Sequence, residues 1–251
     1  MAKRKMNPIL LIILLFLISG CQGQNEQNMS TKNNLLLCDP EEAACEVPDN
    51  TKTKTITPEE FFDRPIKIVY YTDPICSSCW GVEPQLRKLK MEYGDIVEIQ
   101  YHMGGLLPDW SYNSGAISEP SDVAHHWDEF SLDYKMPING DIWLEDPLDS
   151  SYPPSIAFKA AQLQDEKKAI EFMRLLRVMV FLEKTNITKW DVMADTAEKT
   201  GLDVKMLKLH YNNQAKTLFQ ADLDNGRQLG VRGFPTFIMS NGKGVQETVY
   251  G

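Results

Sequence analysis

The chain has 251 residues, of which 43% are hydrophobic and 24% charged, and its formal net charge is −9 at pH 7. This length and composition suit one folded domain, or one domain that carries an insertion. The acidic balance argues against nucleic acid as a partner and against electrostatic adhesion to an anionic membrane, because both surfaces are negative themselves.

The N-terminus has the parts of an export signal. Residues 3–5 are all basic, residues 9–18 form an unbroken apolar run, and two small residues precede Cys21. The run is shorter than the ~20 residues of a membrane-spanning helix, which favours a signal peptide over residues 1–20. Its ending resembles a bacterial lipoprotein signal, which implies cleavage before Cys21 and lipid on that thiol. A plain secretory signal or an uncleaved anchor is the alternative, and either would also place the domain outside the cytoplasm.

Two further cysteines follow the proposed anchor. Residues 21–34 are almost wholly polar after Cys21, so we expect the lipidated cysteine and a flexible tether there. The extension at 35–60 contains Cys38 and Cys45, and an export context permits a disulfide between them. A local structural disulfide is the expected state. A redox relay that exchanges with a second cysteine pair is the alternative.

That second pair lies at the start of a predicted helix. Residues 66–72 are rich in β-branched and aromatic side chains and predict a strand, and a helix is expected over 76–93. Cys76 and Cys79 open this helix. Unpaired N–H groups and partial positive charge in the first turn are expected to lower the pKa of Cys76 and make it a reactive thiolate. Cys79, one turn later, can then attack a mixed disulfide at Cys76, so the pattern indicates a redox pair.

A zinc site and an inert structural disulfide are the other interpretations of Cys-x-x-Cys. Zinc would need two more ligands, and the candidates are His125 with His126, or Cys38 with Cys45. The chain contains no second Cys-x-x-Cys and no His-x-x-x-His in a suitable frame. A structural disulfide across so short a loop would stabilise little. We therefore expect no metal, and no cofactor other than the redox-active disulfide itself.

The rest of the chain alternates between sheet and helix patterns. The expected elements are a strand at 97–103, a loop-rich stretch at 106–152 with one helix near 123–133, helical segments through to 213, a helix at 215–229, and strands at 236–239 and 245–250. The first strand, the helix after it and strand 97–103 have the length of a parallel crossover. Phe234 and Pro235 precede the strand at 236–239, and a cis peptide is far commoner before proline than elsewhere.

In combination these features resemble the thioredoxin superfamily and its DsbA-like branch, particularly the FrnE-like and SpxH-like (YjbH) proteins. The segments that carry the resemblance are 73–81, 151–154 and 181–183. The resemblance implies an α/β, thioredoxin-like fold with an all-helical insertion. The thioredoxin-like domain would comprise 61–112 and 214–251, and the insertion 113–213. Thioredoxin-like domains normally carry one more helix after the last strand. This sequence ends at Gly251 before such a helix, so we expect either a truncated sequence or a last strand left partly uncovered.

The resemblance assigns roles to the residues around the cysteine pair. The implied catalytic residues are the nucleophile Cys76, the resolving thiol Cys79 and the cis-proline Pro235. The implied substrate-binding residues are Phe234, Thr236 and Trp80. Glu83 lies one turn after Cys79, where it is either a proton relay or an acid on the helix surface.

The sequence thus predicts a protein thiol–disulfide oxidoreductase of the cell envelope, held outside the cytoplasm by lipid on Cys21. Its partners would be cysteine-containing client proteins and a redox partner that the sequence does not identify, with no role for nucleic acid. The alternative is a non-catalytic adaptor. SpxH-like relatives are cytoplasmic adaptors that deliver a transcription factor to a protease, and the predicted export signal argues against that alternative. A lipoprotein that only holds a metal or a partner chain is the third interpretation.

Overall fold

The protein is seen here in a computed structural model that describes residues 37–39, 44–46, 66–111, 117–241 and 246–250. The chain divides into two units, Met1–Glu60 and Phe61–Gly251. In the first unit, β1 (Leu37–Asp39) and β2 (Ala44–Glu46) pair antiparallel, and their register sets Cys38 opposite Cys45. The disulfide between these two cysteines stays a prediction. The predicted signal peptide, Cys21 and the tether lie outside the described residues.

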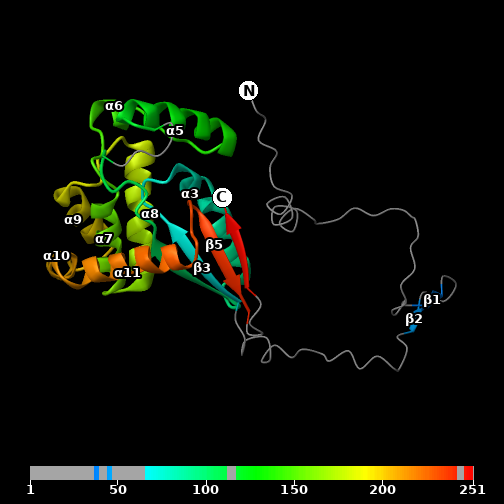
Figure 1. The fold of residues 1–251 in the computed structure, drawn as a ribbon. Coiled ribbons are helices and arrows are strands. Elements are labelled where there is room, and N and C mark those ends of the chain that lie inside the picture. The colour runs from blue at the N-terminus through cyan, green and yellow to red at the C-terminus, as the bar shows by residue number, and fades with distance from the viewer. Residues whose placement is uncertain (1–36, 40–43, 47–65, 112–116, 242–245, 251) are drawn as a thin grey trace. The chain divides into compact units, whose positions relative to one another are not determined.

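The second unit is built on a four-stranded sheet in the order β4-β3-β5-β6 (Figure 1). Its strands are β3 (Ile66–Thr72), β4 (Val97–Met103), β5 (Thr236–Ser240) and β6 (Gln246–Tyr250). Strands β3 and β4 are parallel, and β5 is antiparallel to both β3 and β6. The predicted parallel strand–helix–strand unit is confirmed, and β5, which follows the proline loop, lies beside β3.

The helix expected over 76–93 is two helices, α3 (Ser77–Gly81) and α4 (Glu83–Tyr93). Val82 separates them, and Pro84 occupies the first turn of α4. Proline has no N–H, so it cannot donate to the carbonyl of Trp80 four residues earlier, and a continuous helix would lose that bond. The break sets α3, with the cysteines, apart from the longer α4.

Helices make up the middle of the chain. They are α5 (Pro120–Tyr134), α6 (Ile142–Glu145), α7 (Tyr152–Gln162), α8 (Glu166–Leu182), α9 (Trp190–Lys199) and α10 (Val204–Asn212), and α11 (Gln214–Gln228) leads back to β5. Figure 1 shows α5 and α6 together at one end of this helical part. The sequence predicted only one helix between 106 and 152, whereas the structure also has α6. A helix of four residues is too short for its apolar periodicity to be recognised.

The helices and the sheet share one hydrophobic core. Alanines at 157, 160 and 161 of α7 are fully buried, and they let α7 approach α8 closely. From the sheet, Tyr70 stacks on Phe237 of β5 and lies edge-on to Tyr101 of β4. The ring of Tyr101 in turn packs near Phe158 of α7. The helices that interrupt the thioredoxin-like part of the sequence therefore pack directly on its sheet. No described helix is long and apolar enough to cross a membrane.

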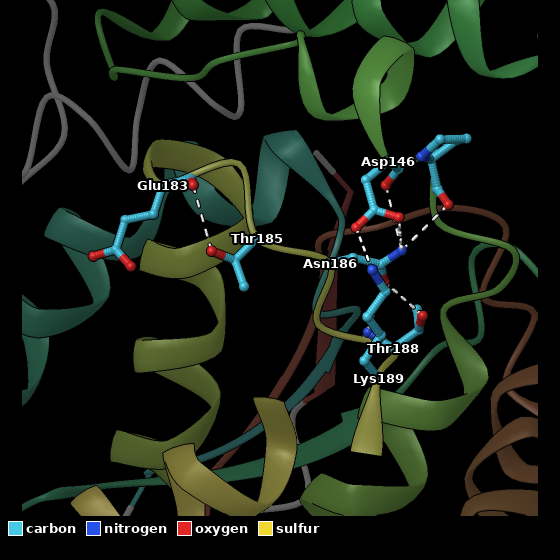
Figure 2. A network of polar contacts seen from close by, with 7 residues as sticks. Asp146, Glu183, Thr185, Asn186, Thr188 and Lys189 are labelled. Carbon is cyan, nitrogen blue, oxygen red and sulfur yellow. Dashed lines mark hydrogen bonds and ion pairs between the residues drawn. The ribbon is translucent and has the colours of Figure 1, made fainter. Parts of the chain in front are cut away.

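A buried asparagine fastens the connection between α8 and α9 to the chain just before α7 (Figure 2). The side-chain amide of Asn186 donates to the carbonyls of Asp146 and Pro147 at 3.3 Å each. Its carbonyl oxygen accepts from the backbone N–H of Thr188 at 3.1 Å. Lys189 adds an ion pair to Asp146 at 2.5 Å, but those two side chains are 51% and 45% exposed.

We expect Asn186→Ala to lower the free energy of unfolding by about 1–3 kcal/mol, because it removes a buried amide and the hydrogen bonds that it makes to part-buried backbone groups. Lys189→Ala, the control, removes only the exposed ion pair and should cost less than about 1 kcal/mol. Urea unfolding followed by circular dichroism measures both. Equal losses for the two variants would show that the buried amide is no more important than the surface pair.

Candidate functional site

The two cysteines lie at the start of α3 as free, buried thiols. Cys76 is the N-cap residue, and its Sγ accepts the backbone N–H of Cys79 at 3.1 Å. A sulfur at this position replaces the hydroxyl or carboxylate that usually satisfies an N–H of the first helical turn. Cys76 is 4% exposed and Cys79 is fully buried. The expected helix start is therefore present, whereas the accessibility expected of a nucleophile is small.

The proline loop faces this pair, as the resemblance implied. The peptide bond between Phe234 and Pro235 is cis. The thiol of Cys76 donates to the backbone carbonyl of Phe234, with 3.6 Å between sulfur and oxygen. Residues 158 positions apart in the sequence thus meet at one point. The catalytic roles of Cys76, Cys79 and Pro235 stay predictions.

The electrostatics of the pair differ from the sequence-based expectation. Burial raises the pKa of Cys76 well above its usual range, and the hydrogen bond and charge of Cys79 raise it further. The N–H of Cys79 lowers it only in part. Burial also acts to raise the pKa of Cys79, but the hydrogen bond with Cys76 and the charge of Arg177 bring it below its usual value. The prediction of an acidic, accessible Cys76 is therefore wrong, because desolvation outweighs the helix N-terminus.

A fully buried arginine from α8 lies beneath the cysteines. Arg177 Nη1 contacts Oε2 of Glu83 at 3.0 Å, and Nη2 donates to the hydroxyl of Thr72 at 2.5 Å and to the carbonyl of Asp73 at 3.1 Å. Its Nε is buried without a partner. The guanidinium thus joins the end of β3, the start of α4 and the middle of α8, and it is the cation that lowers the pKa of Cys79.

Asp73, between β3 and the cysteines, is a second buried polar residue of the site. Its carboxylate accepts the backbone N–H groups of Ile75 at 3.1 Å and Leu106 at 2.8 Å, and the hydroxyl of Ser151 at 2.8 Å. Burial nevertheless raises the pKa of Asp73 to about 6. Asp73 thereby connects the cysteine loop to the chain after β4 and to the residue before α7.

Two of the residues expected to bind substrate, Thr236 and Trp80, have buried side chains that contact other parts of the protein. Thr236 is fully buried and donates its hydroxyl to the carbonyl of Gly233 at 2.7 Å, so it shapes the proline loop from within. Trp80 is 6% exposed, stacks on Phe181 and donates its indole N–H to the carbonyl of Pro137 at 3.1 Å. The side chain of Thr236 is thus enclosed within the proline loop and Trp80 belongs mainly to the core, and the substrate-binding roles of both residues stay predictions.

Phe234 and Glu83 both lie beside the cysteine pair, as the sequence predicted. Phe234 is half-buried, and its ring fills the space that a Cβ on Gly104 would occupy. The carboxylate of Glu83 is paired with Arg177, so its link to Cys79 passes through the guanidinium. Proton relay by Glu83 stays a prediction. Among the described residues, no group of three or more His, Cys, Asp and Glu could hold a metal ion.

Helix α5 packs against α3, which sequence reasoning did not anticipate. The ring of Tyr134 lies against Gly81, where any Cβ would collide with it. Arg177 was also missed, although a signal for it existed. It is spaced four residues from both Met173 and Phe181, so it lies on the apolar face of α8, where a charged side chain needs a buried partner.

A parallel strand–helix–strand unit with Cys-x-x-Cys, faced by a cis-proline loop and covered by inserted helices, defines a thioredoxin-like protein of the DsbA-like type. The family model described as thioredoxin matches residues 70–251. The chain is 37% identical to "ClpXP adapter protein SpxH" of Halalkalibacterium halodurans, over 85% of this chain and 70% of that protein. The chain therefore belongs to the thioredoxin superfamily, in the branch that contains SpxH.

Two further comparisons agree with this placement. The SpxH protein of Bacillus subtilis is 31% identical over 71% of this chain and 59% of its own length. The chain thus spans less than two thirds of that relative. The fold resembles that of "Cytosolic disulfide reductase DsbM from Pseudomonas aeruginosa", with a TM-score of 0.61 and 21% identity over 73% of this chain and 88% of that one. At this identity the likeness concerns the fold alone.

The relatives correct the main functional prediction. The sequence was interpreted as an envelope oxidoreductase that exchanges disulfides with client proteins. The relatives that match most of the chain are instead named as ClpXP adapters. This finding favours the non-catalytic adaptor alternative. The family and the fold were predicted correctly, whereas the function drawn from the cysteine pair was not.

The raised pKa of Asp73 predicts a specific dependence of stability on pH. Because the fold favours the protonated carboxyl, its contribution is full below about pH 4 and is lost as pH rises through about 6. We expect Asp73→Asn to remove this loss, which amounts to at most about 3 kcal/mol between pH 4 and pH 7.

Urea unfolding at pH 4, 5, 6 and 7 measures the difference between wild type and Asp73→Asn. Asp128→Asn, at an exposed position, is the matched control and should follow the wild type throughout. If the difference between wild type and Asp73→Asn does not change with pH, the carboxyl is ionised in the fold without cost.

Proposed function

We propose that this chain is a non-catalytic, protein-binding adaptor. The observation that carries the proposal is its 37% identity, over 85% of its length, to a protein named as an adapter. The protonated, buried state of Cys76 supports it, because a thiol is a poor nucleophile compared with a thiolate. An adaptor needs a fixed binding surface but no turnover at the cysteines.

The same features give the cysteine pair a structural part in the adaptor. The thiol of Cys76 is bonded to the carbonyl of Phe234, and the Arg177 cluster holds α3 and α4 against α8. These contacts fix the proline loop relative to the helices. We therefore propose that the pair stabilises a surface on which a partner polypeptide binds without forming a covalent bond.

The compartment determines where a bound partner is delivered. The relatives are named for ClpXP, and the resemblance described above implies adaptors of the cytoplasm. We propose that residues 1–20 act as a signal and that lipid on Cys21 holds this adaptor at the outer face of a membrane. On that side its recipient would be a protein other than ClpXP.

The adaptor proposal predicts that partner binding survives loss of both thiols. Full-length chain with Cys76→Ser and Cys79→Ser should capture the same partner proteins as wild type, in amounts within about twofold, because no disulfide is exchanged and the serine hydroxyl at 76 keeps a donor for the carbonyl of Phe234. Capture is quantified by mass spectrometry, and circular dichroism confirms that the variant is folded. Reductant-sensitive adducts on a Cys79→Ser variant, together with loss of capture by the double variant, would restore the enzyme interpretation.

The proposed anchor predicts a second outcome. Cys21→Ser should move the chain from the membrane fraction to the soluble fraction and abolish labelling by a radioactive fatty acid. Cys38→Ser, at a cysteine of the same extension, is the control and should change neither. Retention of Cys21→Ser in membranes without any fatty-acid label on the wild type would exclude lipidation.

A further inference from the structure

A groove of about 430 Å³ lies beside the cysteine helix, and neither Cys76 nor Phe234 lines it. We call it the α4 groove. Its walls come from the end of α3, the exposed side of α4, the connection after α5 and one residue of α8. The volume is in the range of sites that enclose a small ligand or a few side chains.

The apolar part of the α4 groove is unusually open to solvent. Met91 is 85% exposed, Pro84 is exposed, and Met136 is half-buried. Trp80 lines the groove with the small part of its ring system that is not covered by the core. Methionine side chains are flexible and polarizable, so surfaces that contain them adapt to varied apolar partners.

The charged part of the groove has two arginines in excess. Arg87 and Arg174 both line it, and neither has a carboxylate partner among the residues that the structure describes. The groove's own acids are already engaged, since Glu83 pairs with Arg177 and Glu92 lies 3.7 Å from Lys88. On a chain with a net charge of −9, this leaves a local positive site around an apolar floor.

We propose that the α4 groove binds an acidic peptide segment of a partner protein. An apolar anchor side chain of that segment would lie against Trp80 and Met136, and carboxylates beside it would pair with Arg87 and Arg174. Guanidinium groups recognise carboxylates through two parallel hydrogen bonds, and arginine next to an aromatic pocket is a common centre of protein binding. The inference rests on the proposed adaptor function and adds the chemistry of the partner.

The test uses full-length protein and two fluorescein-labelled peptides. The first has leucine and phenylalanine flanked by aspartate and glutamate, and the second carries lysine at every acidic position. Fluorescence anisotropy should show binding of the acidic peptide and at least tenfold weaker binding of the lysine peptide. The double variant Arg87→Glu, Arg174→Glu should weaken binding of the acidic peptide at least tenfold.

The matched control is Lys205→Glu, Lys216→Glu, at exposed positions of α10 and α11 that do not line the groove. It changes the net charge by the same amount, so it should leave peptide binding within about twofold of wild type. If both double variants weaken peptide binding equally, the cause is the overall charge of the protein, and the assignment of the peptide to the α4 groove is overturned. Met136→Gln tests the apolar anchor and should also weaken binding.

The outcomes separate this inference from the adaptor proposal. If partner capture is normal but unaffected by reversal of the two arginines, the adaptor proposal stands and the groove assignment fails. If the acidic peptide binds with the expected arginine dependence but no partner protein is captured, the groove stands and the adaptor proposal fails. If the protein self-associates through these arginines and ignores the peptide, the occupant is a second copy and the inference is overturned.

Discussion

The buried charge of Arg177 is the constraint on which the rest of the site depends. Burying a guanidinium away from water lowers the stability of the fold strongly unless hydrogen-bond and charge partners surround it. The fold of this protein therefore requires Thr72, Asp73 and Glu83 to stay in position around Arg177. These partners belong to the end of β3, the loop before the cysteines and the first turn of α4. One side chain of α8 therefore determines how the inserted helices meet the thioredoxin-like part of the molecule.

The same charge accounts for the unusual state of the cysteine pair. It favours the thiolate on Cys79, which is fully buried, while burial keeps Cys76 protonated. The more acidic sulfur is thus the one that no partner can reach. The arrangement of a thiol–disulfide site is present, but burial raises the pKa of Cys76 and the charge of Arg177 lowers that of Cys79, which is the reverse of the order that the sequence predicted.

Local patterns were sufficient to predict most of the sheet. The strands at 66–72 and 97–103 have the predicted bounds, and the proline loop faces Cys76 as the resemblance implied. These features depend on residues close in sequence or on motifs with fixed geometry. The break at Val82 could have been placed from Pro84, because a proline in the interior of a continuous helix removes a backbone hydrogen bond.

What the sequence could not provide depends on contacts between distant residues. The sign of the pKa shift of Cys76 follows from burial under segments far away in the chain, so the helix N-terminus alone gave the wrong direction. Burial of Thr236 has the same origin. The function was mispredicted because a motif shared by enzymes and adaptors was taken as evidence for chemistry, whereas a fold does not specify the activity of its site.

The contact between Gly104 and Phe234 connects position 104 to the surroundings of Cys76, although the two positions are 28 residues apart in the sequence. Because the aromatic ring occupies the place that a Cβ would take, any larger residue at 104 would force the ring to move. The carbonyl of the same phenylalanine accepts the thiol of Cys76, so the ring that position 104 constrains belongs to the residue that contacts the cysteine. The glycine just after β4 thus leaves room for the phenylalanine ring beside the cysteine. A single substitution at 104 would alter the packing of the proline loop without changing either the cysteine or the loop itself.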